Sequence, residues 1–198
     1  MSAYGELMAY VHRDERAGFH HVVTRGNNKR RIYEDDVDRW YFCTTVERIA
    51  KKYGWTILAY CLMDNHYHLV LTVGEQGLSR GMCELNTACA LHYNSRHGRV
   101  NHLFGKRYWN RVLRTNATVV NALRYVVQNP RRAGGTRPLE GYVWASYAAT
   151  IGVAYARIRV DRDQVLEFFG TRAERALEAY RAYCAALPFT GHARWQPP

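Results

Sequence analysis

The 198-residue sequence has no long apolar run. Its longest one, residues 57–63, is far shorter than the roughly 20 residues that a membrane-spanning helix needs, and the mean hydropathy is -0.42. The first residues also lack a basic segment followed by an apolar one, which is the pattern of a secretory signal. We therefore expect no membrane partner and place the chain in the cytoplasm.

Cysteine is scarce, and its spacing suits neither a cross-linked fold nor a metal site. The five cysteines are odd in number and include no Cys-x-x-Cys pair. This argues against a disulfide framework and against a thiolate zinc site. We interpret the cysteines as buried free thiols.

Acidic residues are absent from a long central stretch, between Glu84 and Glu140. Residues 96–137 carry ten basic side chains, nine of them arginines, whose planar guanidinium groups can grip a phosphate with two hydrogen bonds. Three aromatic residues interleaved with them could stack on unpaired bases: Tyr108, Trp109 and Tyr125. Since the whole chain has a net charge of +11, this stretch predicts a nucleic-acid interface, and a solvated basic face is the alternative.

The order of strand and helix signals predicts an α+β fold. Strand-forming runs cover residues 19–24, 55–63, 66–73 and 108–113, and apolar residues recur at helical spacing over 36–52 and 78–93. The resulting order is that of a ferredoxin-like βαββαβ antiparallel sheet, which leaves one face open for a ligand.

An added helix is predicted from residue 117, capped by Asn116 and stopped at Asn129-Pro130. Two shorter helices follow over residues 161–169 and 171–187, the second opened by a capping box of Thr171 and Glu174. We therefore predict one main domain over residues 1–150 and a C-terminal helical extension over residues 151–198.

A pair of histidines, His66 and His68, lies in one predicted strand. Because side chains alternate along a strand, both imidazoles lie on one face and Tyr67 lies on the other. Imidazole binds Mn, Zn and similar ions, so the pair is a candidate metal site. The alternative is a polar pair facing water.

Tyr125 and Asn129 are four residues apart and share one face of the predicted third helix. A phenol with a pKa of about 10 is a poor nucleophile until a cation stabilises its oxyanion. A metal at the histidine pair would supply that charge. Since imidazole and amide ligands are neutral, the ion would keep its full charge for polarising a phosphate oxygen.

Four segments stand in a characteristic order and spacing: HVVTRGNNKRRIYEDD, AYCLMDNHYHLVLT, LNTACALHYNSRHGRVNHLFGKRYWN and LRYVVQNPRRAG. Together they resemble the REP-associated tyrosine transposases, a bacterial branch of the single-tyrosine HUH transposases. The resemblance is close over residues 18–150 and loose over the C-terminal helices.

The resemblance implies that Tyr125 is the catalytic nucleophile and that His66, His68 and Asn129 hold Mg²⁺ or Mn²⁺. It implies cleavage of single-stranded DNA at REP-like palindromic hairpins through a 5′-phosphotyrosine intermediate, with a free 3′-hydroxyl, without ATP and without a small-molecule cofactor. We expect nine residues to contact the DNA: Arg25, Lys106, Arg107, Tyr108, Arg111, Arg114, Arg124, Arg131 and Arg132.

Two positions depart from the family pattern. Tyr67 replaces a bulky hydrophobic residue between the histidines, where it can still pack on the far side of the sheet. Asp64 stands where the family often has proline, and we interpret it as a turn residue, with metal ligation as the alternative. Tyr108 is the rival nucleophile, for which base stacking is the favoured role. Five other histidines are interpreted as packing or phosphate-contacting residues: His20, His21, His92, His97 and His102.

The leading hypothesis is a metal-dependent, site-specific DNA strand transferase. The alternative is a hairpin-DNA-binding regulator on the same scaffold that does not cut. An RNA-binding ferredoxin-like module is disfavoured because its aromatic strand signature is absent. We expect a nucleoid-associated monomer, and a dimer that exchanges its tyrosine helices is the alternative.

Overall fold

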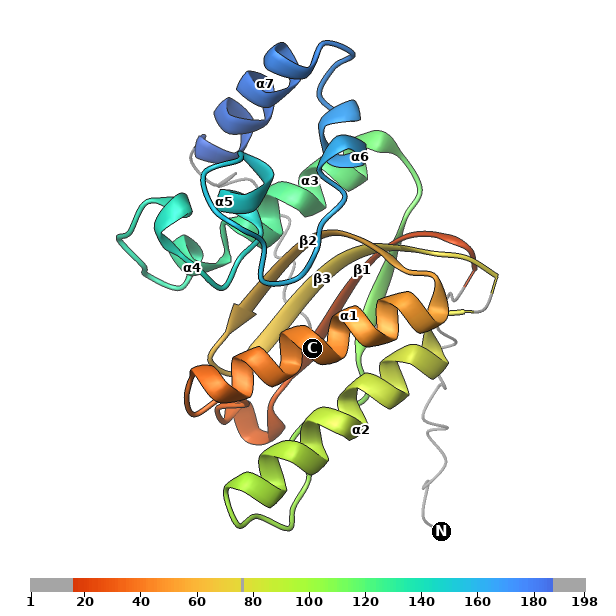
Figure 1. Ribbon diagram of the computed structural model, residues 1–198, viewed down its shortest axis with the longest axis vertical. Helices are drawn as coiled ribbons and strands as arrows, with labels where there is room; N and C mark the ends of the chain where they lie inside the picture. The colour runs from red at the N-terminus through yellow and green to blue at the C-terminus, as the bar shows by residue number, and fades with distance from the viewer. Residues whose placement is uncertain (1–15, 76, 187–198) are drawn as a thin grey trace, which may run out of the picture.

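The computed structural model describes residues 16–75 and 77–186 (Figure 1). Its centre is a four-stranded antiparallel sheet made of β1 (Gly18–Arg25), β2 (Thr56–Met63), β3 (His66–Val73) and β4 (Trp109–Leu113). The strand order is β2-β3-β1-β4, with every neighbouring pair antiparallel. This order confirms the predicted α+β, ferredoxin-like fold, and the last strand begins one residue later than predicted.

Helices α1 (Asp36–Tyr53) and α2 (Ser79–Arg96) pack together across one face of the sheet (Figure 1). The Asp35 carboxylate caps α1 by accepting hydrogen bonds from two backbone N–H groups, and Gly54 ends the helix in a left-handed conformation with φ 65°. Apolar residues such as Phe42 and Met82 fill this side of the core. The side chain of Tyr67 lies here too, as predicted.

The opposite face is covered by α3 (Asn116–Val127), which the short helix α4 (Asn129–Arg132) follows. The predicted cap is corrected by one residue. Thr115, not Asn116, occupies the capping position, because its hydroxyl accepts from the Thr118 N–H while the Thr118 hydroxyl pairs back to the Thr115 backbone.

The C-terminal part adds α5 (Tyr147–Thr150), α6 (Arg162–Glu167) and α7 (Ala173–Ala185), and short 3-10 turns lie at Asn27–Lys29 and Leu139–Gly141. The predicted capping box of Thr171 and Glu174 is wrong. Helix α7 begins after Arg172, which makes no side-chain cap, so the residue at the capping position is Arg172 and not Thr171. The predicted end of this helix, at residue 187, lies outside the described residues.

Helices α6 and α7 share a core with the sheet face that α3 covers. Val165 and Tyr180 pack in the same buried cluster as Leu123 of α3 and Leu58 of β2. Figure 1 shows α3 and α5 to α7 gathered at the same end of the molecule. The predicted extension is therefore packed directly against the helix that carries Tyr125. Among the described helices, none has the length and apolar character to span a membrane.

Candidate active site

The predicted histidine pair lies on the sheet face that α3 covers. The ring centroids of His66 and His68 are 5.0 Å apart, and His68 is fully buried whereas His66 is half-buried. On the other face, Tyr67 Oη accepts a hydrogen bond from Thr24 and donates one to Asn86. Strand alternation therefore places the histidine pair and Tyr67 on opposite faces of the sheet, as predicted. The pair lies beneath a helix and not in open water.

Helix α3 brings the two predicted helical residues to the same place. The ring of Tyr125 lies 5.6 Å from the ring of His68, centroid to centroid. The Asn129 amide nitrogen donates to the Tyr125 carbonyl oxygen at 3.0 Å, which directs the amide oxygen away from the helix backbone. Burial lowers the pKa of both His66 and His68, and a hydrogen bond to the Asn129 side chain opposes this effect in each case. The Asn129 side chain therefore lies close to both imidazoles.

A third imidazole, His21 of β1, belongs to the site and was not predicted. Its Nε2 lies 3.1 Å from Nδ1 of His68, and its ring centroid is 5.8 Å from that of Tyr125. In the β1–β3 register His21 is opposite Val70, so it meets His68 along the diagonal. The sequence signal is the alternation along residues 19–25, FHHVVTR, which places His21 and Arg25 on one strand face, but the strand register is needed to choose that face.

All three imidazoles are neutral at pH 7. Burial lowers the pKa of His66 to about 4 and that of His21 to about 3, and it lowers the pKa of His68 well below its usual value. Repulsion from Arg111 adds to the effect at His21, and repulsion from Arg25 adds to it at the other two rings. Neutral imidazole is the form that binds a metal ion.

The chemistry of these side chains fits a divalent metal. His66 Nδ1 lies 2.7 Å from Asn65 Oδ1, as His68 Nδ1 lies near His21 Nε2. Contacts of this kind fix the tautomer and ring orientation of metal-binding histidines. The other ring nitrogen, Nε2, would then bind the ion. Together with the Asn129 oxygen, the set offers two nitrogens and one oxygen.

Within residues 16–75 and 77–186 the structure contains no cluster of three or more His, Cys, Asp or Glu residues arranged to hold a metal. The candidate set of two imidazoles and one amide is of a different composition. Mixed nitrogen and oxygen donors suit Mn²⁺ better than Mg²⁺, which prefers oxygen ligands.

Two arginines act on the Tyr125 phenol. Burial raises the pKa of Tyr125, and the charges of Arg132 and Arg25 oppose that rise. The guanidinium carbon of Arg132 lies 4.8 Å from the centre of the Tyr125 ring. The Nε atom of Arg25 is buried and has no hydrogen-bond partner among the residues that the structure describes. The surroundings of the phenol are therefore positively charged.

The predicted DNA-contacting residues differ in exposure: six are exposed, one is half-buried and two are buried. Arg25 is half-buried beside the histidines, and the exposed residues are Lys106, Arg107, Arg111, Arg114, Arg131 and Arg132. Tyr108 is only 5% exposed and packs in the core under α1 and α2, so its ring has no open face for a base. Arg124 is buried and donates to the Ala186 carbonyl oxygen at 2.9 Å, so it anchors the end of α7.

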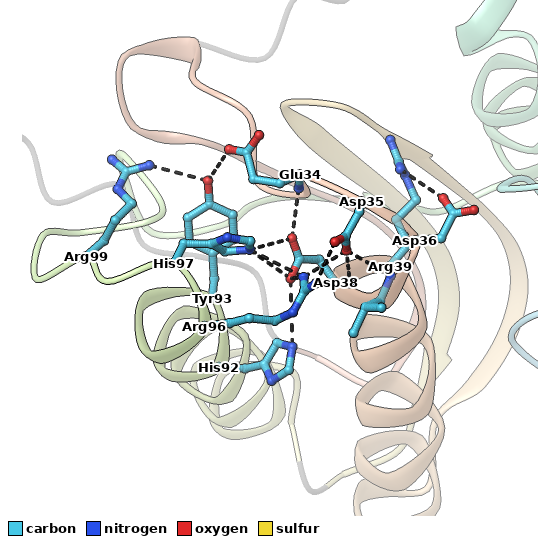
Figure 2. A network of polar contacts seen from close by, with 11 residues as sticks. Glu34, Asp35, Asp36, Asp38, Arg39, His92, Tyr93, Arg96, His97 and Arg99 are labelled. Carbon is cyan, nitrogen blue, oxygen red and sulfur yellow. Dashed lines mark hydrogen bonds and ion pairs between the residues drawn. The ribbon is translucent and has the colours of Figure 1, made fainter.

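The remaining polar candidates lie elsewhere. His92 and His97 face Asp38 in a network that joins α1 to the end of α2 (Figure 2). The Asp64 carboxylate pairs with Arg39 at 2.7 Å and with Arg31 at 3.5 Å. These pairs give Asp64 a structural role within the chain.

The sheet order and the buried imidazoles beneath α3 define a ferredoxin-like α+β domain with a polar site on one sheet face. The chain matches the family described as "Transposase IS200 like" over residues 18–129, more than half of its length. It belongs to this family of transposases, and is thus an enzyme that acts on DNA.

The solved structures that are similar to the chain include a transposase and a candidate transposase. One is described as a REP-associated tyrosine transposase bound to a REP hairpin, with a TM-score of 0.61 and 14% identity over 78% of this chain and 93% of that one. The other is a candidate transposase from Deinococcus radiodurans, with a TM-score of 0.42 and 16% identity over 67% and 99% of the two chains. The first likeness shows a shared fold. No curated protein matches the chain.

Proposed function

We propose that the protein is a site-specific single-stranded DNA endonuclease and strand transferase that acts at REP-like palindromic hairpins. The observation that carries this proposal is the meeting of His66, His68, Tyr125 and Asn129 on one sheet face, within a transposase family. The similar solved transposase bound to a REP hairpin supports the choice of DNA.

In the proposed reaction the Tyr125 phenol loses its proton and its oxygen attacks the phosphorus of one phosphodiester. A new phosphorus–oxygen bond forms to Tyr125, and the bond to the 3′ oxygen breaks. The products are a 5′-phosphotyrosine and a strand with a free 3′-hydroxyl, which takes up a proton. Because one phosphodiester replaces another, the step is nearly isoenergetic and a 3′-hydroxyl can reverse it without ATP.

The side chains of His66, His68 and Asn129 would hold the Mg²⁺ or Mn²⁺ ion. When bound, the ion would polarise a phosphate oxygen and stabilise negative charge at the reacting group. The neutral state of both imidazoles, which their low pKa values give them at pH 7, supports this assignment.

Arginines supply the remaining electrostatics. Arg25 and Arg132 carry positive charge beside Tyr125 and favour its oxyanion. The Nε atom of Arg25 is buried without a hydrogen-bond partner in residues 16–75 and 77–186, and we propose that a DNA phosphate accepts its hydrogen bond. Exposed arginines around the site, such as Arg111 and Arg114, are proposed to grip the backbone of the hairpin.

The test is a denaturing gel of end-labelled hairpin oligonucleotides incubated with Mn²⁺. Wild type should release a labelled fragment and form a covalent protein–DNA adduct. Tyr125→Phe should form neither, because the attacking oxygen is gone, while it still binds the hairpin. Tyr155→Phe is the matched control, since this side chain is 95% exposed and outside the site.

A Tyr125→Phe protein that still cleaves would reject the assignment of the nucleophile. Hairpin binding by wild type with no adduct in Mn²⁺ would favour the non-cutting regulator. We propose in addition that the unit is a monomer, with residues 1–150 as the transposase domain and residues 151–198 as its helical extension. A molar mass of two chains in light scattering would contradict the monomer.

A further inference from the structure

Polar side chains of α3 bind the C-terminal end of α7, and the proposed cleavage uses none of them. They belong to Asn121, Arg124 and Gln128. Their spacing of three and four residues places them on one face of the helix. Helix α3 therefore contacts α7 with a polar face, separate from the apolar residues that it turns toward the sheet.

The innermost of these contacts is made by Gln128, which is only 2% exposed. Its amide nitrogen donates to the carbonyl oxygens of Cys184 at 2.7 Å and of Ala186 at 2.8 Å. Carbonyl groups in the last turn of a helix lack a partner within that helix. The Gln128 amide satisfies two of them, and without these acceptors its own N–H groups would be buried and unpaired.

Arg124 binds the same end of α7 one turn earlier along α3. Its guanidinium group donates to the Ala186 carbonyl oxygen at 2.9 Å, and its central carbon lies 4.9 Å from the centre of the Tyr183 ring. Positive charge is favourable at the C-terminal end of a helix. The Tyr183 hydroxyl in turn donates to Asn121 at 2.6 Å. The contacts thus follow α3 over two turns, which defines both its rotation and its position along its axis.

Helix α7 is itself attached to the sheet. The ring of Tyr180 stacks on that of Tyr147 of α5, with centroids 5.8 Å apart. Just before α5, the Ser146 backbone N–H donates to the Tyr60 carbonyl oxygen in β2 at 3.0 Å, and the Tyr60 N–H donates back to the Ser146 hydroxyl at 3.2 Å. Contacts therefore lead from β2 through α5 and α7 to α3.

The direct contact between α3 and the sheet is of another kind. Leu123 and Val126 of α3 share a buried apolar cluster with Leu58 and Val70 of the sheet. Hydrophobic packing has no preferred direction, whereas a hydrogen bond has one. The directional contacts along α3 that we describe for Arg124 and Gln128 come from α7, so α7 can set where α3 sits on its apolar bed.

The two buried side chains also alternate with the residues of the proposed site. Arg124 directly precedes Tyr125, and Gln128 directly precedes Asn129. A displacement of this part of the helix would therefore move the phenol and the amide together, relative to the histidines on β3.

We propose that Gln128 and Arg124 are positioning residues, which use the end of α7 as a fixed support to hold Tyr125 over the histidine pair. The inference rests on the proposed function and extends it to the C-terminal helices. These helices would contribute to the rate of cleavage through the placement of the nucleophile, and not through contact with DNA.

The first test measures the rate of adduct formation in a single turnover, at saturating labelled hairpin and Mn²⁺. Gln128→Met keeps the length of the side chain and removes both donors, and Arg124→Met removes the guanidinium group. Each should slow the step by about tenfold, less than the roughly hundredfold cost of misplacing a reacting group by 1 Å. Arg124→Lys keeps a cationic donor for Ala186 and should retain most of the wild-type rate. Hairpin affinity, measured by anisotropy without Mn²⁺, should be unchanged in all three variants.

The second test needs neither metal nor DNA. Tyrosines are replaced by 3-fluorotyrosine, and the fluorine resonance of residue 125 is assigned by its absence from Tyr125→Phe. In Gln128→Met this resonance should shift or broaden, because the phenol is no longer held in one place.

The matched control is Tyr67→Phe, which removes one buried hydroxyl on the opposite face of the sheet. Urea unfolding gives the loss of stability of each variant. The control should be destabilised without a slower rate and without a change in the fluorine resonance of residue 125.

A wild-type rate together with an unchanged resonance in Gln128→Met would overturn the inference. So would weaker hairpin binding by Arg124→Met, which would return Arg124 to the DNA interface, or an equal loss of rate in Tyr67→Phe. Adduct formation by wild type reports separately on the proposed function. A resonance that responds as expected in a wild-type background that forms no adduct would reject cleavage and retain the positioning of Tyr125.

Discussion

Strands β1 and β3 are joined by a polar side-chain contact on each face of the sheet, and the two contacts differ in kind. On the face under α1 and α2, the Thr24 hydroxyl donates to Tyr67 Oη at 2.9 Å, which donates in turn to Asn86 at 2.6 Å. On the face under α3, His21 and His68 meet at 3.1 Å. In the first contact, each hydroxyl donates its hydrogen bond to a protein acceptor. The second contact joins two neutral imidazoles.

The charges around the two faces differ in the same way. Near α1 and α2, Asp38 is buried but bonded to Arg96 and His97, so opposite charges meet (Figure 2). Near the imidazoles the charged neighbours are Arg25 and Arg111, whose effect is to repel protons from the rings. Polar groups on the first face stabilise the fold. Those on the second face surround the proposed active site, where neutral imidazoles lie beside positive charge.

Apart from the loss of the Tyr125 nucleophile, the largest expected effect is on the functional face, at His21. We expect His21→Ala to reduce hairpin cleavage by about 10–100-fold, the usual cost of removing a side chain that orients a metal ligand. The Mn²⁺ concentration for half-maximal cleavage should rise, because His68 loses the contact that fixes its ring. Cleavage rates measured across a Mn²⁺ titration, with hairpin affinity measured in parallel, check this.

A glutamine at the same position separates orientation from packing. His21→Gln keeps an amide that can donate or accept toward His68, so it should recover part of the activity and of the Mn²⁺ dependence. If the alanine and glutamine variants both match wild type at every Mn²⁺ concentration, His21 does not position His68. Equal losses in both variants would also contradict that role.

On the structural face, Tyr67→Phe should destabilise the fold and leave the chemistry alone. The change removes one hydroxyl from the buried Thr24–Tyr67–Asn86 chain and leaves a donor and an acceptor unpaired, at a cost of about 1–2 kcal/mol. The midpoint of urea unfolding measures the loss. Although Tyr67 and His68 are adjacent, we expect an unchanged cleavage rate in the folded variant, because strand alternation places them on opposite faces of the sheet. A large fall in the rate would contradict this separation of the two faces.

The same alternation explains what the sequence could predict. Period two places His66 and His68 together, period 3.6 places Tyr125 with Asn129, and both patterns are local. Their convergence depends on α3 packing on the correct face, which the resemblance implied and the tertiary structure fixes. His21 joins the site only through a diagonal contact set by the β1–β3 register, so local patterns could not reveal it.

Burial argues against two of the predicted DNA contacts, Tyr108 and Arg124. Tyr108 and Arg124 were assigned to DNA because of their chemical type and their basic neighbourhood. Side-chain type does not determine exposure: Tyr108 precedes β4 and turns into the core, and Arg124 turns toward the end of α7. The sequence alone does not distinguish an arginine that hydrogen-bonds a backbone carbonyl from one that binds a phosphate.

The smallest expected effect is on the structural face at acid pH, through Asp35. The hydrogen bond from Arg96 holds the pKa of Asp35 down to about 2, well below its usual value. Because the pKa of Asp35 is lower in the folded than in the unfolded chain, its carboxylate stabilises the fold at pH values above its unfolded pKa. This stabilisation is lost as the pH falls toward about 2. Asp35→Asn keeps a side chain that can cap α1 but removes the charge. The difference in urea midpoint between wild type and Asp35→Asn should therefore be constant near neutral pH and shrink as the pH falls below the usual aspartate pKa. It should vanish at a pH where Asp35 is protonated in both the folded and the unfolded protein. A difference that persists unchanged to the lowest pH would mean that the asparagine alters packing or capping and that the Arg96 pair contributes nothing measurable.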